Sequence, residues 1–310
     1  MGWKHRHLLG IQPLSREDIW YLLHKANFFR DSLEEKPKKE GQLNGFFMIN
    51  LFFEPSTRTR ISFEMAAKLL GMEVINFTTE MSSILKGENL RDTVRTLSRL
   101  KADVLVIRHS SSGVPQYLSQ FLPFHIINAG DGMREHPTQA LLDLLTIWRH
   151  FGRLSNLKVA IIGDILHSRV ARSLTIGLQK MGSEVFFSGA PTLVPPEAEK
   201  MGGQIIYPLE KAIQGVDVIY LLRIQQERQK AGFFSSIKEY NHFFSLRKDL
   251  WEKAKGQAII MHPGPVNRGV EVDSELVEGT GSLIEEQVTC GLAVRMAVLD
   301  TLIQEGKAGD

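Results

Sequence analysis

The chain of 310 residues (35.0 kDa) is 43% hydrophobic and 23% charged, which suits a soluble protein of about two domains and excludes disordered, collagen-like and disulfide-scaffold proteins. Lys and Arg number 37 and Asp and Glu 35, so the net charge is +2 and a domain-wide basic field for nucleic acid is excluded. The single cysteine, Cys290, favours a cytoplasmic location, and no apolar run reaches the roughly 18 residues of a membrane helix, so no membrane partner is expected.

Helix and strand signals alternate along the chain. The first is a capping-box-like pair, Ser15 and Asp18, which is followed by apolar residues at helical spacing. The later elements are, in chain order, a charged loop at 34–39, a buried strand at 46–53, a helix at 61–70, a buried strand at 104–107, a helix at 137–151, buried strands at 159–162, 218–222 and 258–261, and a helix at 285–304. Because buried strands alternating with helices are typical of parallel sheets, we expect an α/β fold of two domains, each a mainly parallel sheet flanked by helices.

The domain boundary is expected near residue 150. Pro137 suits the first position of a helix, Gly152 suits its left-handed C-terminal cap, and a short polar segment follows. We expect one domain over 1–150, a second over 151–284, and a last helix, about 285–310, that packs back on the first domain.

A candidate anion site follows the first predicted strand. The run Ser56-Thr57-Arg58-Thr59-Arg60 lies where a tight turn enters a helix. Backbone N–H groups and the helix dipole favour negative charge there, and the guanidinium of Arg58 matches phosphate oxygens. An ordinary helix cap with surface arginines is the alternative, and it suits a lone Ser-Thr pair better than this run.

A second candidate, His136-Pro137-Thr138-Gln139, again begins a helix and follows the run 129–132, which we expect to be flexible. Because a helix N-terminus disfavours added positive charge, His136 should stay neutral and can donate one N–H to a carbonyl oxygen. A purely structural histidine near a turn is the alternative.

Further candidates follow other predicted strands: Arg108, Arg169, Arg223, and the loop 262–269 with its two prolines and a possible cis peptide bond. One more candidate is the polar loop 82–88, which is either an ordinary solvated loop or a flap that closes over phosphate. Ligands of open α/β sheets lie at the carboxyl ends of strands, so the pattern predicts an anionic ligand with more than one charged group.

Cofactors and metals are not expected. No Gly-x-Gly-x-x-Gly or Walker-type loop follows a predicted strand, which argues against a dinucleotide or ATP. His136, His167 and His262 lack clustered carboxylates or thiols, and His5 to His7 lie in an N-terminal stretch that is either loose or an assembly contact.

Together these motifs resemble the aspartate/ornithine carbamoyltransferase family, most closely the catalytic chains of its aspartate members. The resemblance spans nearly the whole chain, and the run 56–60 with His136–Gln139 is highly specific in combination. The loop His262-Pro263-Gly264-Pro265 and the element Arg223-Ile224-Gln225 favour the aspartate branch, since ornithine members typically carry a His-Cys-Leu-Pro loop.

The resemblance also implies roles for individual residues. Carbamoyl phosphate would be bound by Ser56, Thr57, Arg58, Thr59, Arg108, His136, Gln139, Gly264 and Pro265; aspartate by Lys86, Arg169, Arg223 and Gln225; and Ser82 and Lys86 would come from a neighbouring subunit of a homotrimer. The implied catalytic residues are Arg58, Thr59, Lys86, Arg108 and His136, which would polarise the carbonyl group or stabilise the departing phosphate.

The implied reaction is direct transfer of a carbamoyl group to the amine of L-aspartate, giving N-carbamoyl-L-aspartate and phosphate, an early step of de novo pyrimidine biosynthesis. The trimer could work alone or in a higher assembly with a regulatory chain or dihydroorotase. Three competing interpretations remain: a carbamoyltransferase for another amine such as ornithine, a nucleotide-dependent oxidoreductase, and a non-catalytic structural or RNA-binding protein. Arg223 argues against ornithine as the acceptor, and the missing glycine fingerprint argues against an oxidoreductase. The presence of all matched residues argues against a non-catalytic protein.

Overall fold

The computed structural model of the chain describes residues 2–34, 41–78, 90–224, 236–254 and 258–306. It divides into two units: unit 1 comprises Met1–Leu145 and Thr289–Asp310, and unit 2 comprises Thr146–Val288. The divisions fall inside two helices, α5 (Pro137–Phe151) and α11 (Ile284–Glu305). Unit 1 is therefore discontinuous in sequence, and it includes most of the last helix.

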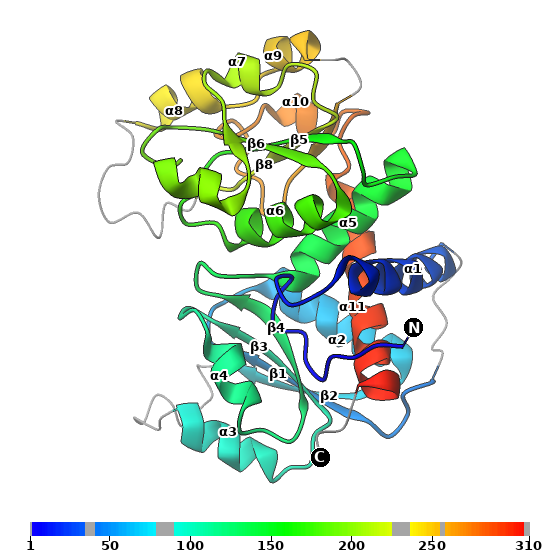
Figure 1. Ribbon diagram of the computed structural model, residues 1–310. Coiled ribbons are helices and arrows are strands. Elements are labelled where there is room, and N and C mark those ends of the chain that lie inside the picture. The colour runs from blue at the N-terminus through cyan, green and yellow to red at the C-terminus, as the bar shows by residue number, and fades with distance from the viewer. Residues whose placement is uncertain (1, 35–40, 79–89, 225–235, 255–257, 307–310) are drawn as a thin grey trace. The chain divides into compact units, whose positions relative to one another are not determined.

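The sheet of unit 1 has four parallel strands in the order β2-β1-β3-β4 (Figure 1). They are β1 (Phe47–Phe52), β2 (Glu73–Thr78), β3 (Val104–His109) and β4 (His125–Asp131). In the register of the sheet Phe52 is opposite Arg108, so β1 and β3 end side by side. The predicted strands at 46–53 and 104–107 are confirmed, as is the parallel arrangement.

Helices pack against the apolar side chains of this sheet and bury them. Unit 1 contains α1 (Arg16–Ser32), α2 (Thr57–Leu70), α3 (Leu90–Ser98) and α4 (Val114–Ser119), besides the parts of α5 and α11 that belong to it. Ile49 and Leu105 of the sheet pack with Val94 of α3 and Leu118 of α4 in one apolar cluster. Helix α1 begins with the predicted capping box, in which Ser15 Oγ accepts a hydrogen bond from the N–H of Asp18 (3.1 Å).

The sheet of unit 2 has five parallel strands in the order β7-β6-β5-β8-β9. They are β5 (Lys158–Ile162), β6 (Glu184–Ser188), β7 (Gln204–Ile205), β8 (Val218–Leu221) and β9 (Ile259–Met261). The helices are α6 (Arg169–Met181), the 3-10 helix η3 (Pro196–Met201), α7 (Leu209–Ala212), α8 (Ile237–Phe244), α9 (Lys248–Lys253) and α10 (Ser274–Val277). Ile162, Leu221 and Ile260 form a core cluster with Leu250 of α9.

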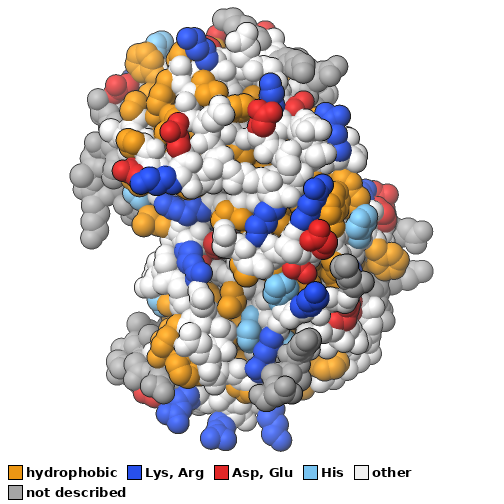
Figure 2. All heavy atoms as spheres, viewed as in Figure 1, with side chains coloured by type: hydrophobic (Ala, Val, Ile, Leu, Met, Phe, Trp, Pro, Cys, Tyr) orange, Lys and Arg blue, Asp and Glu red, His pale blue; other side chains and the backbone are white. Residues whose placement is uncertain are grey.

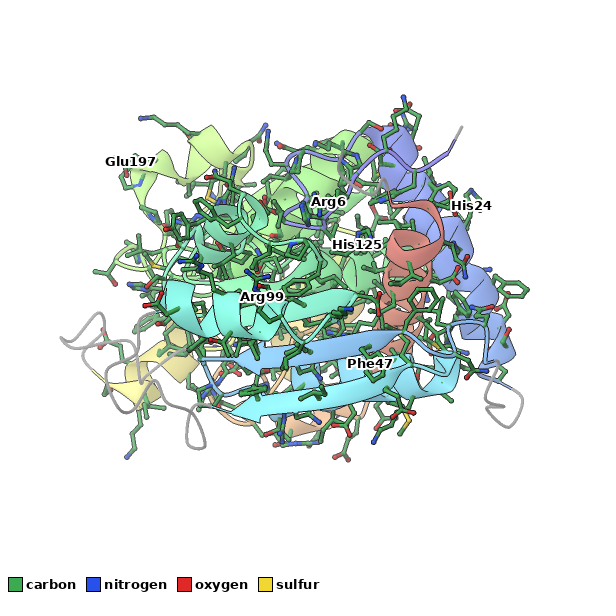
Figure 3. All side chains as sticks on the ribbon, turned by 90° about the horizontal axis from the view of Figure 1, so that it is seen from below. Arg6, His24, Phe47, Arg99, His125 and Glu197 are labelled. Atoms are coloured by element: carbon green, nitrogen blue, oxygen red, sulfur yellow. The ribbon has the colours of Figure 1, made fainter. Side chains whose placement is uncertain are left out.

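The N-terminal segment is bound to unit 1. His5 Nε2 lies 2.9 Å from a carboxylate oxygen of Asp18, and His125 Nδ1 lies 2.7 Å from the carbonyl oxygen of Arg6, which is beside it in Figure 3. Residue 8 then forms a parallel bridge to residue 127 of β4. The expectation that the stretch 5–7 is loose is wrong.

The run 129–132 also differs from its prediction as a flexible turn. Strand β4 continues through it to Asp131, which is fully buried. The Asp131 carboxylate accepts hydrogen bonds from the side chain of Asn128 (2.8 Å) and from the N–H groups of Gly113 (2.6 Å) and Glu135 (3.1 Å). These bonds tie the end of the strand to the turn that precedes His136.

The surface agrees with the small net charge. Figure 2 shows acidic, basic and hydrophobic side chains interspersed over much of the visible face, with Lys and Arg side chains gathered at its lower end. Among the described residues, no helix is long and apolar enough to cross a membrane.

Candidate active site

The N-terminus of α2 presents its backbone N–H groups without a side-chain cap. Ser56 occupies the N-cap position, yet its Oγ donates to Thr59 Oγ1 (3.0 Å) and accepts no capping bond from the helix. By contrast, Ser168 caps α6, because its Oγ accepts a hydrogen bond from Ala171 N–H (3.0 Å). The first turn of α2 contains no acidic residue, and the side chain of Arg58 is exposed there. This helix end therefore keeps the donors and the dipole that attract an anion.

Arg108 joins the ends of three neighbouring strands of unit 1. It follows the buried part of β3, and its side chain is 12% exposed. Its Nη2 donates to Glu54 Oε1 (2.6 Å) in the segment after β1, and its Nη1 donates to the carbonyl oxygen of Ala129 (3.2 Å) in β4. The guanidinium is thus held at the carboxyl edge of the sheet, where an anion can exchange with the carboxylate of Glu54.

His136 and Gln139 enter this edge from the start of α5. The carbonyl oxygen of His136 accepts the first helical hydrogen bond, from Ala140 N–H (3.2 Å), so His136 is the N-cap residue, and it is 4% exposed. Gln139 lies in the first turn and is 8% exposed, and its Nε2 donates to Asp143 Oδ1 (3.1 Å). The edge of unit 1 therefore combines two helix N-termini, a guanidinium, an imidazole and an amide.

Glu135 connects the turn before His136 to the N-terminal segment. This buried carboxylate accepts hydrogen bonds from the N–H groups of Ile11 (2.6 Å) and Gln12 (3.3 Å). Gly10 leaves room for it, because a Cβ there would lie 2.2 Å from Glu135 Oε1. Residues 10–12 thus form a strap, a segment that holds the β4–α5 turn through Glu135.

The pKa of His109, the neighbour of Arg108 in the chain, is shifted by its surroundings. Burial lowers the pKa of His109, while the carboxylates of Glu54 and Asp131 raise it, and the net direction is downward. The ring centres of His109 and Phe53 lie 5.1 Å apart, and the two ring planes are tilted by 55°. A neutral His109 leaves Arg108 as the dominant positive group at this strand end.

Unit 2 places two arginines at the ends of adjacent strands. Arg169 is the first residue of α6, after β5, and is 5% exposed; Arg223 follows β8. Strands β5 and β8 pair in parallel and end together. Gly163 is needed between β5 and α6, because its φ is +122° and a Cβ would lie 3.1 Å from the carbonyl oxygen of Leu222.

The loop after β9 has a rigid path. The Gly264–Pro265 peptide bond is cis, as the paired prolines suggested. His262 Nδ1 accepts a hydrogen bond from Gly264 N–H (2.8 Å), which leaves Nε2 to donate to Glu271 Oε1 (3.1 Å). The same carboxylate oxygen accepts from Asn267 N–H (2.7 Å), so one buried glutamate fixes the loop on both sides of the cis bond.

The sequence-predicted residues fall into three groups. Unit 1 brings Ser56, Thr57, Arg58, Thr59, Arg108, His136 and Gln139 to one edge of its sheet, and unit 2 places Arg169, Arg223, Gly264 and Pro265 after the strands of its own sheet. Ser82, Lys86 and Gln225 lie outside the described residues. Among the residues that the structure describes, no group of three or more His, Cys, Asp or Glu side chains could hold a metal ion.

Two residues that sequence reasoning left without a role hold this site. Glu54 pairs with Arg108, and Asp143 accepts the Gln139 amide. Glu54 lies between the predicted strand at 46–53 and the run Ser56 to Arg60, and Asp143 follows Gln139 by one helical turn, which are the signals in the sequence.

Comparison with known proteins agrees with this architecture. Residues 6–149 match the carbamoyl-P binding domain of aspartate/ornithine carbamoyltransferases, and residues 155–302 match their Asp/Orn binding domain. The aspartate carbamoyltransferase catalytic subunit of Caldanaerobacter subterraneus subsp. tengcongensis is 52% identical over 96% of this chain and 98% of that protein.

Solved structures show the same similarity. Aspartate transcarbamoylase from Trypanosoma cruzi, in complex with carbamoyl phosphate and aspartate, is 33% identical with a TM-score of 0.86, covering 96% of each chain. Ornithine carbamoyltransferase from Pyrococcus furiosus is 30% identical with a TM-score of 0.85, covering 96% of this chain and 97% of that one. With both domain models matched and a relative more than half identical over almost its full length, the chain belongs to the aspartate/ornithine carbamoyltransferase family.

Proposed function

We propose that the chain is an aspartate carbamoyltransferase. It transfers the carbamoyl group of carbamoyl phosphate to the amino group of L-aspartate and releases N-carbamoyl-L-aspartate and phosphate, an early step of de novo pyrimidine biosynthesis in the cytoplasm. The observation that carries the proposal is the uncapped, arginine-bearing N-terminus of α2 next to Arg108 and His136. Relatives named aspartate carbamoyltransferase catalytic subunit support the choice of acceptor.

Unit 1, with the end of α11, is the part that holds carbamoyl phosphate. The phosphate takes the α2 N-terminus, where Ser56, Thr57 and Thr59 supply donors and Arg58 supplies a charge-assisted pair. Arg108 leaves Glu54 for the incoming anion and, with Thr59 and His136, donates to the carbonyl oxygen as negative charge develops there.

Unit 2 is the part that holds aspartate. Arg169 and Arg223, at the ends of the paired strands β5 and β8, suit two carboxylates, and Gln225 adds a polar group. Ornithine is disfavoured, because its second ammonium group would face the buried charge of Arg169. The backbone at Gly264 and Pro265, fixed through His262 and Glu271, contacts both substrates.

The reaction needs no covalent intermediate on the protein. The neutral amine of aspartate donates its lone pair to the carbonyl carbon, and the C–O bond to phosphate breaks. Phosphate leaves with that electron pair and takes up the proton that the nitrogen loses. Arg58 and Lys86 stabilise the departing phosphate. Because both substrates are anions, fixed cationic groups also help to bring them together.

The working unit is a homotrimer in which Ser82 and Lys86 reach the site of the neighbouring subunit. An exposed apolar patch on unit 1 supports contact between copies: Ile61 (51% exposed) and Met65 (48%) lie one turn apart on α2, and Ile75 (38%) lies on the adjacent edge strand β2. A regulatory chain or dihydroorotase would be a further partner of this trimer.

The test is turnover of carbamoyl phosphate with aspartate or ornithine, alongside the native mass. We expect carbamoylaspartate from an assembly of three chains of 35.0 kDa, or a multiple of three. Citrulline from ornithine alone would show that the roles of Arg169 and Arg223 are wrong. A fully active monomer would refute the shared site.

A further inference from the structure

A buried polar layer lies behind the carbamoyl phosphate half of the site, and the reaction steps above leave it unused. Its members are Gln139 and Asp143 on α5, Arg295 on α11, and Ser62 on α2. Asp143 is fully buried and Arg295 is 4% exposed. Charged residues in such positions need specific partners, since burial removes the water that would otherwise stabilise their charges.

Arg295 is held in place on several sides. Its Nη1 donates to Ser62 Oγ (3.0 Å) and to the carbonyl oxygen of Gly291 (2.8 Å), and its guanidinium carbon lies 5.1 Å from the centre of the Phe63 ring. Gly291 leaves the space, because a Cβ there would lie 2.7 Å from Arg295 Nη1. The arginine therefore has a built socket between α2 and α11.

The charge of Asp143 acts on Arg295. Burial lowers the pKa of Arg295 to about 10, and the carboxylate of Asp143 acts in the opposite direction and raises it. At that pKa the guanidinium stays charged at neutral pH. By the same attraction the cation favours the ionised carboxylate of Asp143, which accepts hydrogen bonds and donates none.

The ionised carboxylate decides which way the Gln139 amide faces. An amide offers a donor on one side and an acceptor on the other, and only its Nε2 can bond to an acceptor-only group. With Nε2 on Asp143 Oδ1 (3.1 Å), the Oε1 side is turned away from Asp143. Gln139 thereby presents a hydrogen-bond acceptor at the start of α5, beside His136.

We propose that Asp143, backed by Arg295, is a positioning residue that orients the Gln139 amide to accept a hydrogen bond from the NH₂ of the carbamoyl group, and so selects carbamoyl over acetyl phosphate. The inference rests on the proposed function. Acetyl phosphate has the same phosphate and carbonyl groups, but a methyl group replaces the NH₂. A site with a fixed acceptor rejects this analogue, because its buried polar group is left unpaired.

The experiment compares Asp143→Asn and the double variant Asp143→Leu/Arg295→Met with the wild type. The double variant removes both buried charges together, so no lone charge remains. The measurements are kcat and KM for carbamoyl phosphate and the competitive inhibition constants of acetyl phosphate and inorganic phosphate. Thr301→Val is the matched control, since Thr301 is a fully buried residue of α11 whose Oγ1 has no hydrogen-bond partner.

We expect KM for carbamoyl phosphate to rise about 10-fold in the double variant, the loss of one oriented hydrogen bond, and by a smaller factor in Asp143→Asn, whose amide can hold Gln139 in either orientation; both inhibition constants should change less than about twofold. A purely structural role would instead weaken carbamoyl phosphate, acetyl phosphate and phosphate together, which would overturn the proposal. So would wild-type selectivity in both folded variants. If the wild type itself produces no carbamoylaspartate, the proposed function fails.

Discussion

His7 gives unit 1 a pH-dependent stability that can be worked out from its surroundings. Its Nδ1 accepts a hydrogen bond from Ile126 N–H (3.0 Å), so a second proton would enter on an atom that already faces a donor. Burial, then the charge of Arg6, then that of His125, lower the pKa of His7 from 6.5 to about 4. Between these values the unfolded chain binds a proton that the folded chain does not, so stability falls as the pH drops through this window.

Linkage over the full shift gives about 2 kcal/mol of lost stability at pH 5. Because the His7 ring is only half-buried, solvent screening should reduce this loss to about 1 kcal/mol. The assay is urea unfolding of the wild type and of His7→Asn between pH 7.5 and 4.5, since the asparagine oxygen can replace Nδ1 as the acceptor. On going from pH 7.5 to pH 5, the wild type should lose about 1 kcal/mol more than the variant.

His24→Asn is the control for this experiment, because His24 lies on an exposed position of α1. It should follow the wild-type pH dependence. Parallel pH dependences for the wild type and His7→Asn would refute the reasoning, because they would mean that His7 takes up its proton equally in the folded and unfolded chains.

Three further substitutions test other parts of the chain. Arg58→Ala should lower kcat/KM about 100-fold or more with little change in the unfolding temperature, because the side chain is exposed in the structure and acts on phosphate; steady-state kinetics and calorimetry measure both. Gly163→Ala should cost about 1–3 kcal/mol of unfolding free energy, since its Cβ would meet the Leu222 carbonyl at 3.1 Å; urea unfolding measures it. Glu135→Gln should cost about 2 kcal/mol, because its 2.6 Å bond from Ile11 N–H loses its charge and an amide donor faces the strap; thermal unfolding measures it.

Each of these substitutions has its own control and contradicting result. Near-normal turnover by folded Arg58→Ala would remove that residue from the phosphate site. For Gly163, alanine at Gly45 is the comparison, because its φ is also positive and a Cβ there meets nothing within 4 Å; equal losses would show strain alone and no crowding. Wild-type stability of Glu135→Gln would show that the strap does not depend on the carboxylate.

Strands buried on both faces were the most predictable elements. Strand β1 was expected at 46–53 and is Phe47–Phe52, because a run almost without polar residues fits few other places in a fold. Strand β2 (Glu73–Thr78) was not assigned, since it lies at the sheet edge and most of its side chains are at least partly exposed. Its hydrophobic pattern is therefore weak, although its pairing with β1 is complete.

The residues of the candidate site also differ in how well the sequence predicts them. Residues contiguous in a motif, such as Ser56 to Arg60, were predictable because one helix N-terminus presents them together. The pair of Glu54 and Arg108 was not, since it depends on β1 and β3 being neighbours across 54 positions of sequence. Arg295 had only a faint signal, a single charge within an apolar stretch of the last helix, and its partners come from two other helices.

The discontinuity of unit 1 has a consequence for how the protein is made. Residues up to Leu145 are synthesised before unit 2, but the stretch from Thr289 that completes unit 1 is synthesised only after it. At about 5–20 residues per second, the place of α11 stays unfilled for roughly 7–30 s while unit 2 is translated. During that interval the nascent chain exposes the surfaces that Arg295 and its apolar neighbours will cover, and a chaperone that shields them would have its main task then.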